Sequence, residues 1–344
     1  MGCNCSCTNK DKSTELINEV ENPVVNEKEN EKENENERTS IHSNININFH
    51  IEEIKDKEKE RPKLTQKVSL KGNFLDKNIS EILEELNPAA NKIDIPEEMT
   101  IEQPSNIELP PIKLNNGEIY AGGWNIHGQK EGYGINIDKD NKIYKGLWKN
   151  NNYGEYGCFI DNNGNYYKGN LVNGIVKGKG EMFLKDKFKY IGEFDNDRPN
   201  GEGKLINFED ETNYTGHIIN GVKVGNGVLE FNDGTKYEGE FKDDKFEGKG
   251  KIVYSNGEEY EGDFKNNLKE GNGVFRWPNG QKYEGQFKND IKNGKGKLFL
   301  DENKFYEGNW INGQPHGKGS YNINGEALSG IFRYGKIIIT GNEK

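Results

Sequence analysis

A tyrosine followed two positions later by a glycine recurs at a fixed interval through the second two-thirds of the 344-residue chain. The tyrosines are 23 or 24 positions apart: Tyr120, Tyr144, Tyr167, Tyr190, Tyr214, Tyr237, Tyr260, Tyr283 and Tyr306. A fixed period of this size is typical of repeat proteins, in which each unit is one small motif that contacts only its neighbours. We therefore expect an array of local units, and the low hydrophobic content of 31% also argues against one large core.

The residues between the tyrosines predict that each unit is a β-hairpin. Six positions after each tyrosine from Tyr144 onward stands a residue that tolerates the positive φ of tight hairpin turns: Asn150, Asn173, Asn196, Asn220, Asp243, Asn266, Asn289 and Asn312. A second turn, such as Asp233-Gly234, leads to the next tyrosine. Consecutive antiparallel strands would then form one meander with local pairing.

The sequence Tyr237-Glu-Gly-Glu-Phe241 shows how such a strand would pack. Side chains alternate between the two faces of a strand, so Tyr, Gly and Phe share one face while Glu238 and Glu240 share the other. Gly239 is expected to leave room for a neighbouring ring. The same roles are predicted for the other repeat tyrosines and glycines: Tyr144 and Gly146, Tyr167 and Gly169, Tyr190 and Gly192, Tyr214 and Gly216, Tyr260 and Gly262, Tyr283 and Gly285, and Tyr306 and Gly308.

Tyr-Glu-Gly-Glu-Phe followed at fixed spacing by Gly-Lys-Gly resembles the MORN (membrane occupation and recognition nexus) repeat. A Gly-x-Gly occurs eleven residues after each tyrosine from Tyr167 onward, whereas the Tyr144 unit has Glu155 in place of the first glycine. The resemblance implies an all-β fold, an elongated single-layer antiparallel hairpin array. We expect nine repeats and a terminal half repeat over residues 112–344, the half repeat having Leu328 for tyrosine and stopping after one strand.

Composition changes near Pro111. Residues 1–111 hold 14 basic and 24 acidic residues, against 33 and 34 in the remainder of a chain with 47 and 58. We therefore divide the chain into residues 1–7, residues 8–111 and the array at 112–344. The middle segment is expected to be mostly disordered, because stretches such as 26–38 are highly charged and lack apolar residues. A short helix is predicted over 79–86, ended by Pro88, either as a docking motif or as a cap on the first repeat.

The first seven residues, Met1-Gly2-Cys3-Asn4-Cys5-Ser6-Cys7, fit the N-myristoylation pattern. Gly2 would be acylated after removal of Met1. One myristoyl chain gives only marginal membrane affinity, so Cys3, Cys5 and Cys7 are predicted palmitoylation sites that complete a stable anchor. Two alternatives are a small metal site made by the three thiolates and an unmodified tail.

Several functional classes find no support in the sequence. The chain lacks the basic excess that nucleic-acid binding requires, and it has no apolar stretch of about 18 residues that could span a membrane. None of its five histidines stands at metal-ligand spacing or beside a plausible nucleophile, and Cys158 lies in a predicted strand. We expect no enzymatic activity, no cofactor and no metal.

The expected function is that of a membrane-tethered scaffold, whose repeats bind protein partners at the cytosolic face of a plasma, cortical or ciliary membrane. The Asn, Lys and Ile content is similar to that of protist proteins. Two alternatives come from the resemblance: a ciliary, axonemal or cytoskeletal component similar to radial-spoke-head MORN proteins, and a module that binds phosphoinositides or regulates their kinases. The net charge of −1 over residues 112–344, from 33 basic and 34 acidic residues, argues against strong phospholipid attraction. End-to-end homo-oligomers are a further expectation, because the sheet would have open ends.

Overall fold

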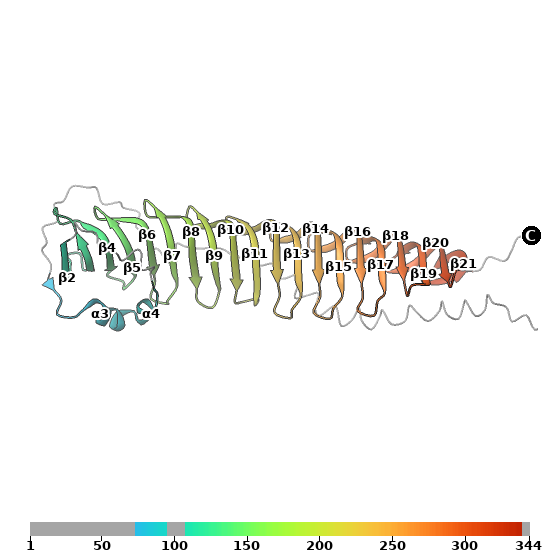
Figure 1. Cartoon of the computed structure of the whole chain (residues 1–344), viewed down its shortest axis with the longest axis horizontal. Coiled ribbons are helices and arrows are strands. Elements are labelled where there is room, and N and C mark those ends of the chain that lie inside the picture. Colours follow the sequence, from blue (N-terminus) through green and yellow to red (C-terminus); the bar gives the residue numbers. More distant parts are fainter. Residues whose placement is uncertain (1–72, 95–106, 339–344) are drawn as a thin grey trace, which may run out of the picture. The chain divides into compact units, whose positions relative to one another are not determined.

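The computed structural model describes residues 73–94 and 107–338. The predicted acylation motif at 1–7 and most of the acidic segment lie outside the described residues. The described part is all-β apart from two short helices, α3 (Ile79–Leu86) and α4 (Pro88–Asn91) (Figure 1). None of the helices in this part is long and apolar enough to cross a membrane.

The strands follow one another in sequence order and pair antiparallel, which confirms the predicted fold class. They are β1 (Asn73–Phe74), β2 (Ile107–Lys113), β3 (Ile119–Trp124), β4 (Lys130–Ile137), β5 (Ile143–Lys149), β6 (Asn152–Ile160), β7 (Tyr166–Val172), β8 (Ile175–Leu184), β9 (Phe188–Asp195), β10 (Arg198–Asn207), β11 (Thr212–Ile219), β12 (Val222–Glu230), β13 (Lys236–Lys242), β14 (Lys245–Val253), β15 (Glu259–Lys265), β16 (Leu268–Arg276), β17 (Lys282–Lys288), β18 (Ile291–Phe299), β19 (Lys304–Ile311), β20 (Gln314–Ile323), β21 (Glu326–Arg333) and β22 (Lys336–Ile338). Contacts group the described residues into two units, which meet in sequence between Val224 and Gly225. We call them the N-terminal unit and the C-terminal unit.

The strand array begins earlier than the composition indicated. Strand β2 starts at Ile107, before the expected boundary at residue 112, and pairs with both β1 and β3. Its pairing with β3 is irregular between Leu109 and Ile112. Pro110 and Pro111 occupy that irregular stretch, where a residue without an N–H costs no ladder hydrogen bond.

The C-terminal unit ends later than expected. Strand β21 is followed by a second strand, β22, which pairs with it through Ile331, Phe332 and Arg333. The prediction that the chain stops after one strand is therefore wrong. Tyr334 and Gly335 have φ values of 49° and 79°, and these positive values make the tight turn that the earlier repeats make with Asn or Asp.

Positive φ values at the hairpin turns are confirmed for every predicted position. They lie between 47° and 53° at Asn150, Asn173, Asn196, Asn220, Asp243, Asn266, Asn289 and Asn312. The following turn residue also has a positive φ, for example 66° at Asp197 and 88° at Gly221. Two successive left-handed residues form the turn whose twist matches that of the flanking strands, so these turns fix the register of each hairpin.

Helix α3 occupies the predicted range and is capped by Asn78, whose side chain accepts a hydrogen bond from the Glu81 N–H. Helix α3 ends before Pro88, as predicted, and Pro88 begins a second short helix, α4, which was not predicted. Proline suits the first position of a helix, where its missing N–H would have no partner. Asn87 caps helix α4, because its side-chain oxygen accepts a hydrogen bond from the Ala90 N–H.

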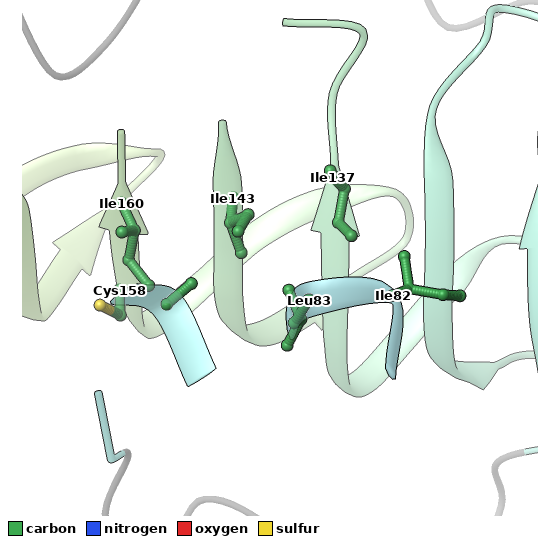
Figure 2. Packing of buried hydrophobic residues seen from close by; sticks show 7 residues of the cluster. Ile82, Leu83, Ile137, Ile143, Cys158 and Ile160 are labelled. Carbon is green, nitrogen blue, oxygen red and sulfur yellow. The ribbon is translucent and has the colours of Figure 1, made fainter. Parts of the chain in front are cut away.

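Both helices pack on the sheet of the N-terminal unit. Ile82, Leu83 and Ala90 are buried against a group of strand residues: Ile137, Ile143, Cys158 and Ile160 (Figure 2). The Asn87 side chain also donates to the backbone oxygen of Asp161 at 2.9 Å. The sequence left open whether this helical segment is a docking motif or a cap on the first repeat. In the structure it packs on the array itself, across β4, β5 and β6. We call residues 79–91 the helical strap.

Candidate functional site

The repeat tyrosines all lie on one face of the sheet, in strands β3, β5 and so on to β19; we call it the aromatic face. Each tyrosine is 3% exposed or less. Each hydroxyl donates to a backbone oxygen three residues later, as Tyr237 does to Glu240 at 2.9 Å and Tyr260 to Asp263 at 2.9 Å. Burial raises the pKa of the Tyr237 and Tyr260 phenols, and that of Tyr306 to about 12, so these three groups remain neutral hydrogen-bond donors at physiological pH.

Glycine is required beneath each ring. A Cβ on Gly250 would lie 2.5 Å from the Tyr237 hydroxyl oxygen, and a Cβ on Gly239 would lie 2.5 Å from the Cα of Gly250. The two glycines are paired across β13 and β14. The ring that these glycines accommodate belongs to Tyr237 of the same hairpin, and the same arrangement recurs at seven other repeat tyrosines: Tyr120, Tyr144, Tyr167, Tyr190, Tyr260, Tyr283 and Tyr306.

Rings connect each repeat of the C-terminal unit to the next. Tyr237 contacts Phe264 of the following repeat with ring centroids 5.2 Å apart, and it also stacks on Phe246 of its own hairpin at 3.6 Å. Edge-to-face contacts between repeats continue at Tyr260–Phe287, Tyr283–Trp310 and Tyr306–Phe332. Such pairs add about 0.5–1.5 kcal/mol each beyond area burial, so neighbouring repeats stabilise one another.

Buried lysines on the aromatic face were missed by sequence reasoning. Lys269 takes the place in its repeat that Phe246 takes in the preceding one, nine residues after the tyrosine. Its ammonium donates to the Tyr254 hydroxyl at 2.9 Å and lies 5.6 Å from the Tyr260 ring centroid. Lys292 occupies the next equivalent place, 4.7 Å from the Trp277 ring centroid. The signal was present in the repeat alignment, where this position holds lysine in some repeats and an apolar or aromatic residue in others.

A second missed feature is the role of the second turn residue. The side chain of Asp197 accepts the Val176 N–H of the preceding hairpin at 2.7 Å, while the Asp197 N–H donates to the Val176 oxygen at 3.1 Å. The same two-way contact joins Asn151 to Lys130, Asn267 to Phe246 and Asp290 to Lys269. The tight turns therefore also fasten each hairpin to the one before it.

The face opposite the tyrosines, which we call the opposite face, is charged in the C-terminal unit. Lys251 lies across from Glu238 on one side and Glu261 on the other. Lys297 likewise lies between Glu284 and Glu307, with an ion pair of 3.2 Å to Glu307. Exposed pairs of this kind stabilise a fold by only about 0–1 kcal/mol, so they mainly keep this face in water.

In the N-terminal unit the same face is apolar where the helical strap covers it. Cys158 and Lys145 are also buried there. The Lys145 ammonium donates to the Ala90 carbonyl at the end of α4. Burial raises the pKa of the Cys158 thiol to about 12 and lowers the pKa of Lys145. A thiol held in this way is an inert packing residue, as its place in a strand predicted.

The apolar surface continues beyond the strap. Tyr166 packs against the residues beneath the strap and stacks on Phe183 with ring centroids 5.4 Å apart, and Phe183 contacts Phe208 at 5.9 Å. Phe208 is 39% exposed. We call Tyr166, Phe183 and Phe208 the uncovered patch.

Charged groups border the uncovered patch. Glu181 accepts a hydrogen bond from the Tyr166 hydroxyl, forms an ion pair with Lys189 at 2.9 Å and lies 3.8 Å from the Lys168 ammonium. Burial acts to raise the pKa of the Glu181 carboxyl, but the hydrogen bonds from Tyr166 and Lys189 outweigh it and hold that pKa below its usual range. The carboxylate therefore stays ionised between two lysines.

The predicted lipidation residues Gly2, Cys3, Cys5 and Cys7 lie outside the described residues. Within residues 73–94 and 107–338, no group of three His, Cys, Asp or Glu side chains is placed to hold a metal ion. The residues that the structure brings together are thus the ring ladder of the aromatic face and the strap with its adjoining patch on the opposite face.

A comparison with protein-family models places the MORN repeat on this chain at seven stretches: residues 144–166, 190–206, 214–236, 237–259, 260–282, 283–300 and 306–323. Residues 144–323 carry MORN repeats. The stretches begin at repeat tyrosines, Tyr144 among them. No curated protein matches the chain.

Solved structures with some likeness include two TCP domains. One is the SAS-4 (dCPAP) TCP domain of Drosophila melanogaster in complex with a proline-rich motif of Ana2 (dSTIL), 18% identical, covering 44% of this chain and 82% of that chain with a TM-score of 0.29. The other is the TCP10 domain of Danio rerio CPAP in complex with a peptide of Danio rerio STIL, 13% identical, covering 65% and 96% with a TM-score of 0.24. Likenesses at these scores carry no argument about this chain.

Proposed function

We propose that the chain is a non-enzymatic scaffold that binds protein partners through its MORN repeats while lipid groups on its first residues hold it at the cytosolic face of a membrane. The observation that carries the proposal is that the two faces of the sheet differ in what their side chains contact. Rings and buried lysines fill the aromatic face, and their role is to join hairpin to hairpin. The opposite face and the hairpin tips are left to meet partners.

The sequence supports the tether. Gly2 fits the acceptor of a myristoyl group, and Cys3, Cys5 and Cys7 stand beside it for palmitoylation. Two or more acyl chains give stable binding where one does not, since each buried CH₂ contributes about 0.8 kcal/mol. The long acidic segment between the motif and β1 would let the repeats reach partners away from the membrane surface.

The runner-up function is a structural component of an axoneme or the cytoskeleton, which needs no lipid. The two are separated by the partition of the full chain between membrane and soluble fractions of a eukaryotic cell. Wild type would float with membranes, whereas Gly2→Ala and the triple Cys3, Cys5 and Cys7→Ser variant would shift to the soluble fraction. Equal partition of all three would overturn the tether and favour the axonemal or cytoskeletal function.

A further inference from the structure

We propose that the helical strap is a reversible cover, which undocks from the sheet as one unit while the hairpins beneath it stay folded. The inference goes beyond the proposed scaffold function, because it describes a conformational change of the chain itself and holds whatever the repeats bind. Undocking would expose Ile137, Ile143 and Ile160 on the opposite face (Figure 2). The closed strap therefore withholds an apolar surface that accepts a helix.

The hairpins beneath the strap are joined by contacts in which the strap takes no part. On the aromatic face, Trp148 of β5 lies edge to face against Tyr120 of the preceding repeat, with ring centroids 5.6 Å apart. Its indole N–H also donates to the Gly134 oxygen in β4 at 3.2 Å. The two-way contact of Asn151 with Lys130 fastens the hairpin of β5 and β6 to β4 from the turn. The sheet is thus held together from its other face and from its edge.

The C-terminal unit shows that such a sheet forms without a helix on it. Among the described residues 225–338 there are strands and turns but no helix. The hairpins there are joined by the same ring contacts, as between Tyr260 and Phe287, and by the same turn contacts, as between Asp290 and Lys269. Loss of the strap should therefore leave the array folded.

The strap, in contrast, depends on the sheet for its own structure. Helices α3 and α4 span eight and four residues, and isolated helices shorter than about 12–15 residues are marginal in water. Their turns are stabilised by burial of Ile82, Leu83 and Ala90 on the strands. Because helix formation and docking support each other, the segment should undock as a whole. Strand β1 precedes the strap and pairs with β2, so an undocked strap would stay near its place and could redock.

The closed state carries a cost that undocking removes. Lys145 is buried beneath the strap, and its ammonium donates to the Ala90 carbonyl at the end of α4. Burial lowers the pKa of Lys145, so closure disfavours the charged form of this side chain. Undocking would return the ammonium to water, which offsets part of the cost of exposing the apolar surface.

Hydrogen exchange of the full chain tests whether the strap opens by itself. We expect the amides of residues 79–91 to exchange as one group, about tenfold or more faster than the amides of β4, β5 and β6. Equal protection of strap and strands would overturn the proposal, because the strap would then open only when the sheet unfolds. Exchange of the strap amides one by one would also overturn it, since that pattern indicates fraying and not undocking.

A strap peptide added in trans tests the docking. In a chain whose three N-terminal cysteines are replaced by serine, Cys158 is the one thiol and reports whether the sheet beneath the strap is covered. Leu83→Asp in this chain should expose Cys158, and a saturating peptide of residues 77–94 should then slow its labelling by about tenfold or more. A peptide carrying Leu86→Asp is the matched control and should protect equally, because Leu86 is 37% exposed. A peptide carrying Leu83→Asp should not protect.

Two results of the peptide experiment would overturn the reversible cover. The first is labelling of Cys158 that the unsubstituted peptide does not slow. The second is loss of the β-sheet circular dichroism in the Leu83→Asp chain, since a sheet that unfolds with the strap is not merely covered by it. Neither result depends on membrane partition, so failure of the cover and failure of the tether are distinguishable.

Discussion

Pro199 and Gly221 lie on successive hairpins and are joined by a hydrogen bond from the Gly221 N–H to the Pro199 oxygen, 3.0 Å long. Elsewhere the second turn residue also supplies a side-chain acceptor for an N–H of the preceding hairpin, as Asp197 does for Val176. Proline has no N–H, so glycine can stand opposite it without leaving a buried donor unsatisfied. The Gly335 N–H donates to the Pro315 oxygen in the same way. Glycine is not confined to places opposite proline, since the Gly313 N–H donates to the Lys292 oxygen.

Asp197→Gly is expected to destabilise the array by about 1–2 kcal/mol. The substitution keeps the positive φ of this turn position but leaves the Val176 N–H without its acceptor, and an unsatisfied buried donor costs about that much. Gly221→Asn is the control, since it adds a side chain opposite Pro199 and should change stability by less than about 0.5 kcal/mol. Urea unfolding followed by circular dichroism measures both, and equal losses would contradict the role given to the side chain.

Gly250→Ala is expected to cost about 1–3 kcal/mol, because its Cβ would lie 2.5 Å from the Tyr237 hydroxyl oxygen. Adding Tyr237→Phe should recover part of the loss by removing that oxygen. Gly234 has a φ of 90°, and a Cβ added there would have nothing within 4 Å, so Gly234→Asn should be nearly neutral. A Gly250→Ala variant as stable as wild type would show that the glycine pair is not needed beneath the ring.

Alkaline pH should unfold the array. Burial raises the pKa of Tyr237, Tyr260 and Tyr306 above the ordinary value of 10.0, to about 12 at Tyr306. Because the folded state prefers the neutral phenol, this contribution is complete below about pH 10 and is lost as pH rises toward the folded pKa. Ionisation of these tyrosines should therefore leave the thermal midpoint unchanged below about pH 10 and lower it above that pH. Tyrosinate absorbance should appear as the chain unfolds. Full tyrosine ionisation with retained β-structure would be the opposing result.

Leu83→Asp should release the helical strap and make Cys158 reactive. Leu83 is buried on the sheet, whereas Cys158 is 0% exposed beneath the strap and its pKa is raised to about 12 by burial. In a Cys3, Cys5 and Cys7→Ser chain, we expect slow thiol labelling that Leu83→Asp accelerates by about tenfold or more. Leu86→Asp, on the exposed side of the same helix, should label like the parent. If both aspartates had the same effect, helix charge and not strap packing would explain the reactivity.

The hairpin array could be predicted from the sequence because its determinants are local. Each tyrosine, turn asparagine and glycine pair lies within one repeat, and repetition made the pattern visible. The strap's place could not be predicted, since the bond from Asn87 to Asp161 joins residues 74 positions apart. The two-way turn contacts were missed for a related reason: Asp197 fits a tight turn by its own conformation, and only the neighbouring hairpin shows what its carboxylate accepts.

Buried lysines illustrate a different limit. Lys269 would be assigned to a solvent-facing position by its charge, yet it is 3% exposed, and its ammonium donates to the Tyr254 hydroxyl and lies 5.3 Å from the Phe275 ring centroid. The change in charge and composition near Pro111 placed the start of the array at residue 112. Pro110 and Pro111 are instead tolerated at an irregular stretch of β2 pairing.

The central claim is that one chain links a membrane to proteins held on its repeats, and comparing proteins cross-linked to wild type and to Gly2→Ala in cells tests it most directly. The account predicts that both forms capture the same partners, but that these partners float with membranes only alongside wild type. Partners that reach the membrane fraction equally with wild type and Gly2→Ala would contradict the tethered scaffold.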